Sequence, residues 1–177
     1  TAGTLGCFCR AERLEKEILI LSNNHVLANE NDANIGDAIV QPGPMDGGRD
    51  LEGPGGHRIA TLLCFVPIEF GGNPNLVDAA LGKPTNPALV KPEILQKGRV
   101  TSKVTGAAAP ALNTKVWKSG RTTQYTKGVI SGVGATVRVG YDAGIALFRD
   151  QVIVTPGGFS APGDSGSAIL DSRNRVR

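Results

Sequence analysis

The sequence has few of the residues that mark several common classes of protein. It contains only two histidines and three cysteines, Cys7, Cys9 and Cys64, and no paired CxxC motif. These numbers argue against a metal site, and we expect no metal and no other cofactor. The excess of 19 basic over 16 acidic residues is small, so neither nucleic acid nor an anionic membrane surface is indicated as a partner. No run approaches the roughly 20 apolar residues of a membrane-spanning helix.

The cysteines and the first residues are the two features of the sequence that bear on the cellular location of the protein. The odd number of cysteines leaves at least one thiol unpaired, while a bridge from Cys7 or from Cys9 to Cys64 stays open. Residues 1–6 show no basic leader followed by an apolar stretch. We therefore expect a soluble protein without a visible signal peptide, and its localisation is unknown at this stage.

What the sequence does contain favours short β-strands. Hydrophobic residues make up 40% of the chain, enough for a core, and 24 glycines indicate many tight turns. Short apolar or β-branched runs alternate with turn residues, and no helical periodicity of useful length occurs. One helical turn is considered at Pro92–Lys97. Strands are expected at Thr4–Arg10, Glu17–Leu21, Asp37–Gln41, Ile59–Phe65, Ala79–Gly82, Lys115–Lys118, Gly128–Val139, Gly144–Thr155 and Ser167–Leu170.

Three segments carry the residues best suited to catalysis. In Pro162–Ser167, Ser165 stands between an aspartate and a glycine. The glycines allow a tight turn and leave the amides of Gly163 and Ser165 free to form an oxyanion hole. His25 follows an apolar strand and two asparagines, and Asp78 precedes an apolar run. Taken singly, each has an ordinary explanation: a turn between strands, a surface or capping histidine, and an aspartate that starts a strand.

The three segments together are more specific, because their order along the chain is His, Asp, Ser. That order differs from those of subtilisin and of the α/β-hydrolases. The segments resemble the three catalytic motifs of trypsin-like serine proteases. In addition, Val116–Thr123, which contains Ser-Gly-Arg-Thr-Thr, is similar to a strand motif of bacterial enzymes of the streptogrisin and α-lytic type.

The resemblance implies an all-β fold of two antiparallel β-barrels of the chymotrypsin type, with the active site in the crevice between them. Residues 1–100 are expected to form the first barrel, with a linker at about 84–112, and residues 113–177 the second. The implied activity is that of a serine endopeptidase acting on polypeptides through an acyl-enzyme, with self-processing as a further expectation. In it Ser165 is the nucleophile, His25 the general base and Asp78 the group that orients the histidine.

The substrate pocket is assigned to Gly157, Phe159 and Ser160. Because Gln151–Gly163 contains no acidic residue, no preference for Lys or Arg before the scissile bond is expected. A medium apolar side chain is favoured instead.

The chain also departs from the family pattern. Trp117 and Lys127 stand where secreted bacterial relatives usually have a disulfide, and Val26 stands where many relatives have a bridged cysteine. By comparison with the family, the first strand and the last strands are missing from this chain. We therefore expect a cleaved C-terminal segment of its own, or a second copy, as a partner.

Two alternatives to a peptidase remain open. The first alternative is a latent or inactive protease fold that binds peptides. The second is an esterase that uses the same three residues. A fluorophosphonate probe separates the first from an enzyme, because it labels only an activated serine. Hydrolysis of an ester but not of an amide would favour the second.

Overall fold

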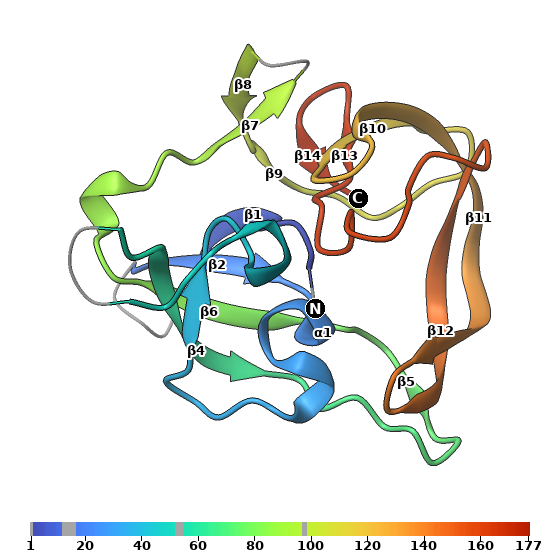
Figure 1. The fold of residues 1–177 in the computed structure, drawn as a ribbon. Helices are drawn as coiled ribbons and strands as arrows, with labels where there is room; N and C mark the ends of the chain where they lie inside the picture. The colour runs from blue at the N-terminus through green and yellow to red at the C-terminus, as the bar shows by residue number, and fades with distance from the viewer. Residues whose placement is uncertain (1, 12–16, 52–54, 97–98) are drawn as a thin grey trace.

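A computed structural model of the chain describes residues 2–11, 17–51, 55–96 and 99–177. Its strands form two main sheets and a separate hairpin, and the only helices among the described residues are one short α-helix and three 3₁₀ turns (Figure 1). The expected all-β fold class is therefore confirmed.

The first sheet is antiparallel throughout and has the strand order β1-β2-β6-β4-β3. Apolar residues alternate along β4, so that Ala60 and Leu62 point inward and are buried. They pack in two neighbouring clusters, one with Ile20 and Ile39 and one with Ala28. The strands are β1 (Cys7–Arg10), β2 (Ile18–Ser22), β3 (Ala38–Val40), β4 (Arg58–Phe65) and β6 (Ala80–Pro84).

The connections of the first sheet contain the short helical elements. The chain leaves β2 directly into the one-turn helix α1 and then the 3₁₀ turn η1. The elements are α1 (Asn24–Leu27), η1 (Asn29–Asn31), η2 (Pro44–Asp46) and η3 (Pro87–Leu89).

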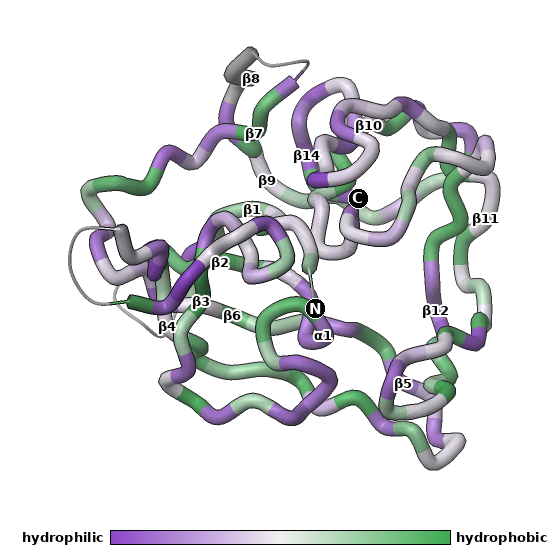
Figure 2. Tube along the Cα trace, viewed as in Figure 1, coloured by the Kyte–Doolittle hydropathy of each residue, from purple (hydrophilic) through white to green (hydrophobic). Residues whose placement is uncertain are grey.

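The second sheet has the order β5-β12-β11-β10-β13-β14-β9. Its long hairpin, β11 with β12, runs down the side of the molecule away from the first sheet and reaches β5 (Figure 1). Figure 2 shows apolar residues recurring in stretches of β2, β6 and β11. The strands are β5 (Pro74–Asn75), β9 (Gly106–Ala107), β10 (Lys115–Gly120), β11 (Gln124–Tyr141), β12 (Gly144–Thr155), β13 (Leu170–Asp171) and β14 (Arg175–Val176).

The structure corrects the helical turn considered at Pro92–Lys97. Residues Glu93–Gln96 form strand β7, which pairs with β8 (Arg99–Lys103) as an antiparallel hairpin. Lys97 lies outside the described residues. Exposure alternates along β7 with the period of a strand, and the hairpin supplies hydrogen-bond partners that an isolated helical turn lacks.

Other strand bounds also differ from expectation. The strand expected at Ser167–Leu170 begins only at Leu170, because Ser167 is held in a turn by its amide hydrogen bond to the Asp164 carbonyl. The two main sheets have five and seven strands.

All three cysteines are free, so neither bridge to Cys64 is formed. Within the described ranges, no three His, Cys, Asp or Glu side chains are grouped to hold a metal ion. No helix in that part of the chain has the length and apolar character needed to cross a membrane.

Candidate active site

His25 lies in α1, which begins directly after the buried strand β2. Asn24, the residue before His25, fixes the helix. Its side chain is fully buried, and its Nδ2 donates to Asn31 Oδ1 and to the Val66 carbonyl, at 2.7 Å each. Asn23 donates from Nδ2 to the Asp78 carbonyl at 2.7 Å. The asparagines before the histidine therefore join its helix to the segment that carries the aspartate.

Both carboxylate oxygens of Asp78 face His25. The His25 amide donates to Oδ1 at 3.2 Å, and Nδ1 forms a hydrogen bond with Oδ2. Burial of the Asp78 carboxyl raises its pKa, but the hydrogen bonds from His25 and from Tyr141 outweigh this and lower the pKa overall. The carboxylate is thus ionised at neutral pH, and the tautomer in which it accepts from Nδ1–H leaves Nε2 as a hydrogen-bond acceptor.

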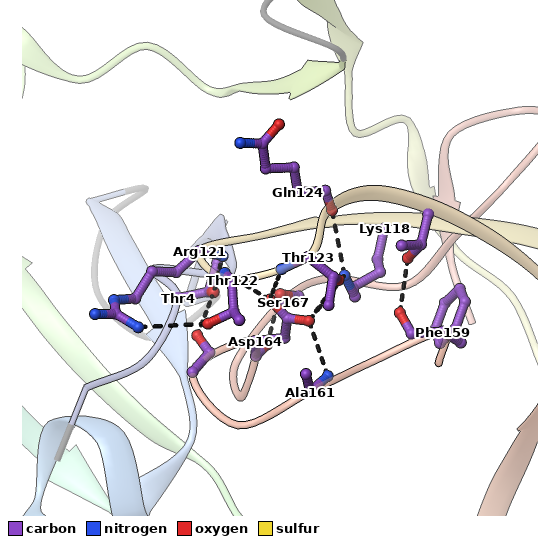
Figure 3. Close-up of polar contacts among 12 residues, drawn as sticks. Thr4, Lys118, Arg121, Thr122, Thr123, Gln124, Phe159, Ala161, Asp164 and Ser167 are labelled. Atoms are coloured by element: carbon purple, nitrogen blue, oxygen red, sulfur yellow. Dashed lines mark hydrogen bonds and ion pairs between the residues drawn. The ribbon is translucent and has the colours of Figure 1, made fainter. Parts of the chain in front are cut away.

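Ser165 lies in a tight loop whose anchor is the side chain of its neighbour Asp164. The Asp164 carboxylate is 2% exposed and accepts from the Thr122, Thr123 and Ala161 amides at 2.8–3.0 Å and from the Thr123 hydroxyl at 2.6 Å (Figure 3). Burial raises the pKa of Asp164, but these hydrogen bonds outweigh it and hold the pKa well below its usual range.

Lys118 neutralises the buried carboxylate. Its Nζ lies 3.1 Å from Asp164 Oδ2, and its side chain is almost fully buried. Nζ also donates to the Thr123 hydroxyl and, at 3.2 Å, to the Gln124 carbonyl. Strand β10 therefore supplies the cation that compensates the charge under the serine loop.

The two amides expected in the oxyanion hole have no hydrogen-bond acceptor among the described residues. The carbonyls of the same peptide units are held, however. Thr122 Oγ1 donates to the Pro162 carbonyl at 2.8 Å, which fixes the peptide that carries the Gly163 amide. Ser167 donates from N and Oγ to the Asp164 carbonyl, at 3.0 and 2.6 Å, which fixes the peptide that carries the Ser165 amide.

The N-terminal segment joins the serine loop to the first sheet. The Thr4 amide donates to the Ser165 carbonyl at 2.7 Å, and Thr4 Oγ1 donates to the Gly163 carbonyl at 3.1 Å. Gly3 borders both this carbonyl of Ser165 and the side chain of Val26, the residue after the histidine. The nucleophile loop and the histidine helix thus meet across residues 3 and 4.

The structure joins two of the three expected catalytic side chains directly, His25 and Asp78. Among the described residues, Ser165 Oγ forms no hydrogen bond, either with His25 or with another group. Hydrogen bonds of catalytic serines are often long or misaligned without substrate, so this geometry leaves the complete triad as a proposal.

The three residues assigned to the substrate pocket lie in different environments. Gly157 and Ser160 are exposed. Phe159 is 7% exposed and packs in a core cluster with Val116 and Ile130. Its side chain therefore contributes to the barrel interior, and the pocket assignment stays a prediction.

Sequence reasoning missed four residues that contact the site residues or the loop around Ser165: Thr4, Lys118, Thr122 and Tyr141. It also missed Glu30, whose carboxylate accepts from the two amides that follow Tyr141. Lys118 and Thr122 belong to the motif that supported the resemblance, and a lysine within the apolar run of β10 was an available signal of a buried ion pair. The other three lie in segments without a motif.

No protein-family model matches the chain, and no curated protein is similar to it in sequence. Solved structures do match. A Nocardiopsis protease has 17% identity and a TM-score of 0.61, over 100% of this chain and 77% of that one. Thermobifida fusca protease A has 20% identity and a TM-score of 0.64, over 99% and 73%. The chain has the fold of the bacterial chymotrypsin-like serine proteases. A glutamic acid-specific serine protease matches as well, with 18% identity and a TM-score of 0.60, over 98% and 81%.

Proposed function

We propose that this chain is a serine endopeptidase, with Ser165 as nucleophile, His25 as general base and Asp78 as the residue that orients the histidine. The observation that carries the proposal is the pairing of both Asp78 oxygens with His25. The structural neighbours, which are described as proteases, support a hydrolase of this type and polypeptide substrates.

The proposed reaction uses the geometry described above. His25 Nε2 takes the proton of Ser165 Oγ as this oxygen attacks a peptide carbonyl carbon. The Gly163 and Ser165 amides, which have no acceptor of their own within the described residues, stabilise the negative tetrahedral oxygen. Removal of one such donor costs about 3–4 kcal/mol in other enzymes. The imidazolium then gives its proton to the leaving amine, and water hydrolyses the acyl-enzyme with His25 again as base.

A fluorophosphonate probe tests the proposal, because it reacts with an activated serine only. We expect one label per chain on Ser165 of the wild type and none on Ser165→Ala. Ser172→Ala, which changes an exposed serine in the turn between β13 and β14, serves as the control and should be labelled like the wild type. Absence of label from the folded wild type would reject the proposal.

The second candidate is a latent or inactive protease fold that binds peptides. The observation that favours it is that Ser165 Oγ lacks a hydrogen bond to His25 among the described residues. Peptide binding to unlabelled, folded protein, measured by calorimetry, would support this candidate. Self-processing is included in the main proposal: intact mass spectrometry should show cleavage of the wild type on incubation and no cleavage of Ser165→Ala.

A further inference from the structure

Tyr141 reaches the proposed catalytic pair from the opposite sheet. It is the last residue of β11, at the tip of the long hairpin, and its hydroxyl donates to Asp78 Oδ2 at 3.1 Å. This is the same oxygen that pairs with His25 Nδ1. The Tyr141 ring meets the imidazole edge-to-face, with 5.5 Å between the ring centroids. The phenol therefore contacts both members of the pair.

The orientation of the Tyr141 ring is constrained by aromatic neighbours. Phe70 contacts the ring edge-to-face at 5.8 Å between centroids, and Phe148 lies at 6.3 Å. Burial, and then the negative charge of Asp78, raise the pKa of Tyr141 above its usual value. The hydroxyl thus keeps its proton at every pH at which a peptidase of this kind works, and it remains a donor to the carboxylate.

Glu30 holds the hairpin tip that carries Tyr141. Its carboxylate accepts from the Ala143 amide at 2.8 Å and from the Asp142 amide at 3.3 Å. These are the two residues that follow Tyr141. A side chain of η1, in the connection between β2 and β3, therefore holds the hairpin tip of the second sheet next to the residue whose phenol contacts Asp78.

The turn that presents Glu30 is strained. Asn29, Glu30 and Asn31 have φ angles of 47°, 59° and 80°, a left-handed conformation that is unfavourable for residues with a side chain. The Asn31 side chain is held on both sides, since Nδ2 donates to the Ile68 carbonyl and Oδ1 accepts from the Ile68 amide, at 2.9 Å each. Such strain persists only where the surroundings fix it, and it is concentrated at functional sites.

We propose that Tyr141 is a positioning residue for the His25–Asp78 pair, and that Glu30 holds it in place. The inference rests on the proposed peptidase function. His25 holds Asp78 through its amide on Oδ1 and through Nδ1 on Oδ2. The Tyr141 hydroxyl adds a donor on Oδ2 that comes from a different part of the chain, so the carboxylate is fixed independently of the imidazole that it orients. Because Asp78 lies in the segment that leads from β5 into β6 of the first sheet, and Tyr141 ends β11 of the second, the contact also joins the two sheets at the site.

Tyr141→Phe is the central test, because it removes the hydroxyl and keeps the ring. We expect kcat on a peptide substrate to fall by about tenfold, the usual effect of losing a hydrogen bond to a charged group, with KM changed less than threefold. Glu30→Ala should lower kcat in the same direction. Glu30→Gln, which keeps an acceptor for the Ala143 amide, should recover most of the loss.

Tyr125→Phe is the matched control, since it removes the hydroxyl of the only other tyrosine, which packs against Trp117. It should leave kcat unchanged. An unchanged kcat in Tyr141→Phe would overturn the inference. So would equal losses in both phenylalanine variants, because these would indicate a general effect on stability.

A second readout separates this inference from the proposed function. This readout is the NMR resonance of the His25 Nδ1 proton, measured in the folded protein without turnover. We expect its resonance to shift or broaden in Tyr141→Phe and in Glu30→Ala, and to stay in place in Tyr125→Phe. If the wild type takes no fluorophosphonate label and the resonance still responds, the peptidase proposal fails and the positioning role stands. A labelled wild type whose resonance is the same in Tyr141→Phe would overturn the positioning role alone.

Discussion

Replacing Lys118 by methionine removes the cation beneath the proposed nucleophile loop and keeps a side chain of similar length. Lys118 is 1% exposed and Asp164 is 2% exposed, and Nζ lies 3.1 Å from the carboxylate. Water therefore cannot reach the Asp164 carboxylate to solvate it in place of the Lys118 ammonium group unless the loop opens. The variant leaves a buried carboxylate without a counter-ion.

The size of the effect follows from what remains around Asp164. Removing one partner of a buried ion pair costs about 3–5 kcal/mol. Asp164 keeps three backbone amide donors and the Thr123 hydroxyl, so we expect the lower end, about 3 kcal/mol. At an m-value of about 2 kcal/mol per molar urea, the unfolding midpoint should fall by about 1.5 M. Proposed peptidase activity should also decrease, because the charge is beside Ser165.

Urea unfolding followed by tryptophan fluorescence measures this change. Lys115→Met is the control on the same strand, since Lys115 is exposed and should cost less than about 0.5 kcal/mol. The double variant Lys118→Met with Asp164→Asn removes both charges and should be more stable than Lys118→Met alone. A loss below about 1 kcal/mol in Lys118→Met, or additive losses in the double variant, would refute the argument.

Three further predictions test the packing, the pH dependence and the thiols. Gly166 has a φ of +90°, and a Cβ added there would overlap neighbouring atoms, whereas Gly134 also has a positive φ but open space around it. Gly166→Ala should therefore destabilise the chain by at least about 2 kcal/mol more than Gly134→Ala. Equal urea midpoints of the two variants would contradict this. Because the folded pKa of Asp164 lies below the unfolded value of about 3.9, its contribution is present above that value and is lost as pH falls through the folded pKa. Asp164→Asn should therefore lose less stability than the wild type between about pH 5 and pH 3, as measured by urea midpoints. Iodoacetamide should modify exposed Cys64 first and Cys7 last, because burial, followed by the neighbouring Cys9 thiol, raises the pKa of Cys7 to about 11; peptide mass spectrometry would show the order.

The strands were predicted well where a long β-branched run has clear turn residues at its ends. Gly144–Thr155 has the expected bounds, and the strand expected at Gly128–Val139 extends to Gln124–Tyr141. The helical turn considered at Pro92–Lys97 was wrong, because a run of six residues has too little periodicity to distinguish a turn of helix from a strand. There the hairpin partner β8, and not local propensity, decides the conformation.

The residues of the candidate site also differ in how far the sequence predicts them. His25, Asp78 and Ser165 were predicted as catalytic residues because each stands in a short motif whose neighbours perform local tasks, such as the asparagines that fix α1. The residues that hold the site together have no such surroundings. Their roles come from contacts between distant parts of the chain.

Sequence separation explains why no pattern along the chain marks these contacts. Thr4 and the Gly163 carbonyl are 159 residues apart, the Ala143 amide and Glu30 113, and Tyr141 and Asp78 63. Each bond also joins the first sheet or its connections to the second, so it forms only when the two sheets meet. The short motifs therefore supply the groups proposed for the chemistry, while the meeting of the sheets sets their geometry. It follows that substitutions of Thr4, Glu30 or Tyr141 should have a larger effect on the rate of the proposed peptidase reaction than on the folding of either sheet.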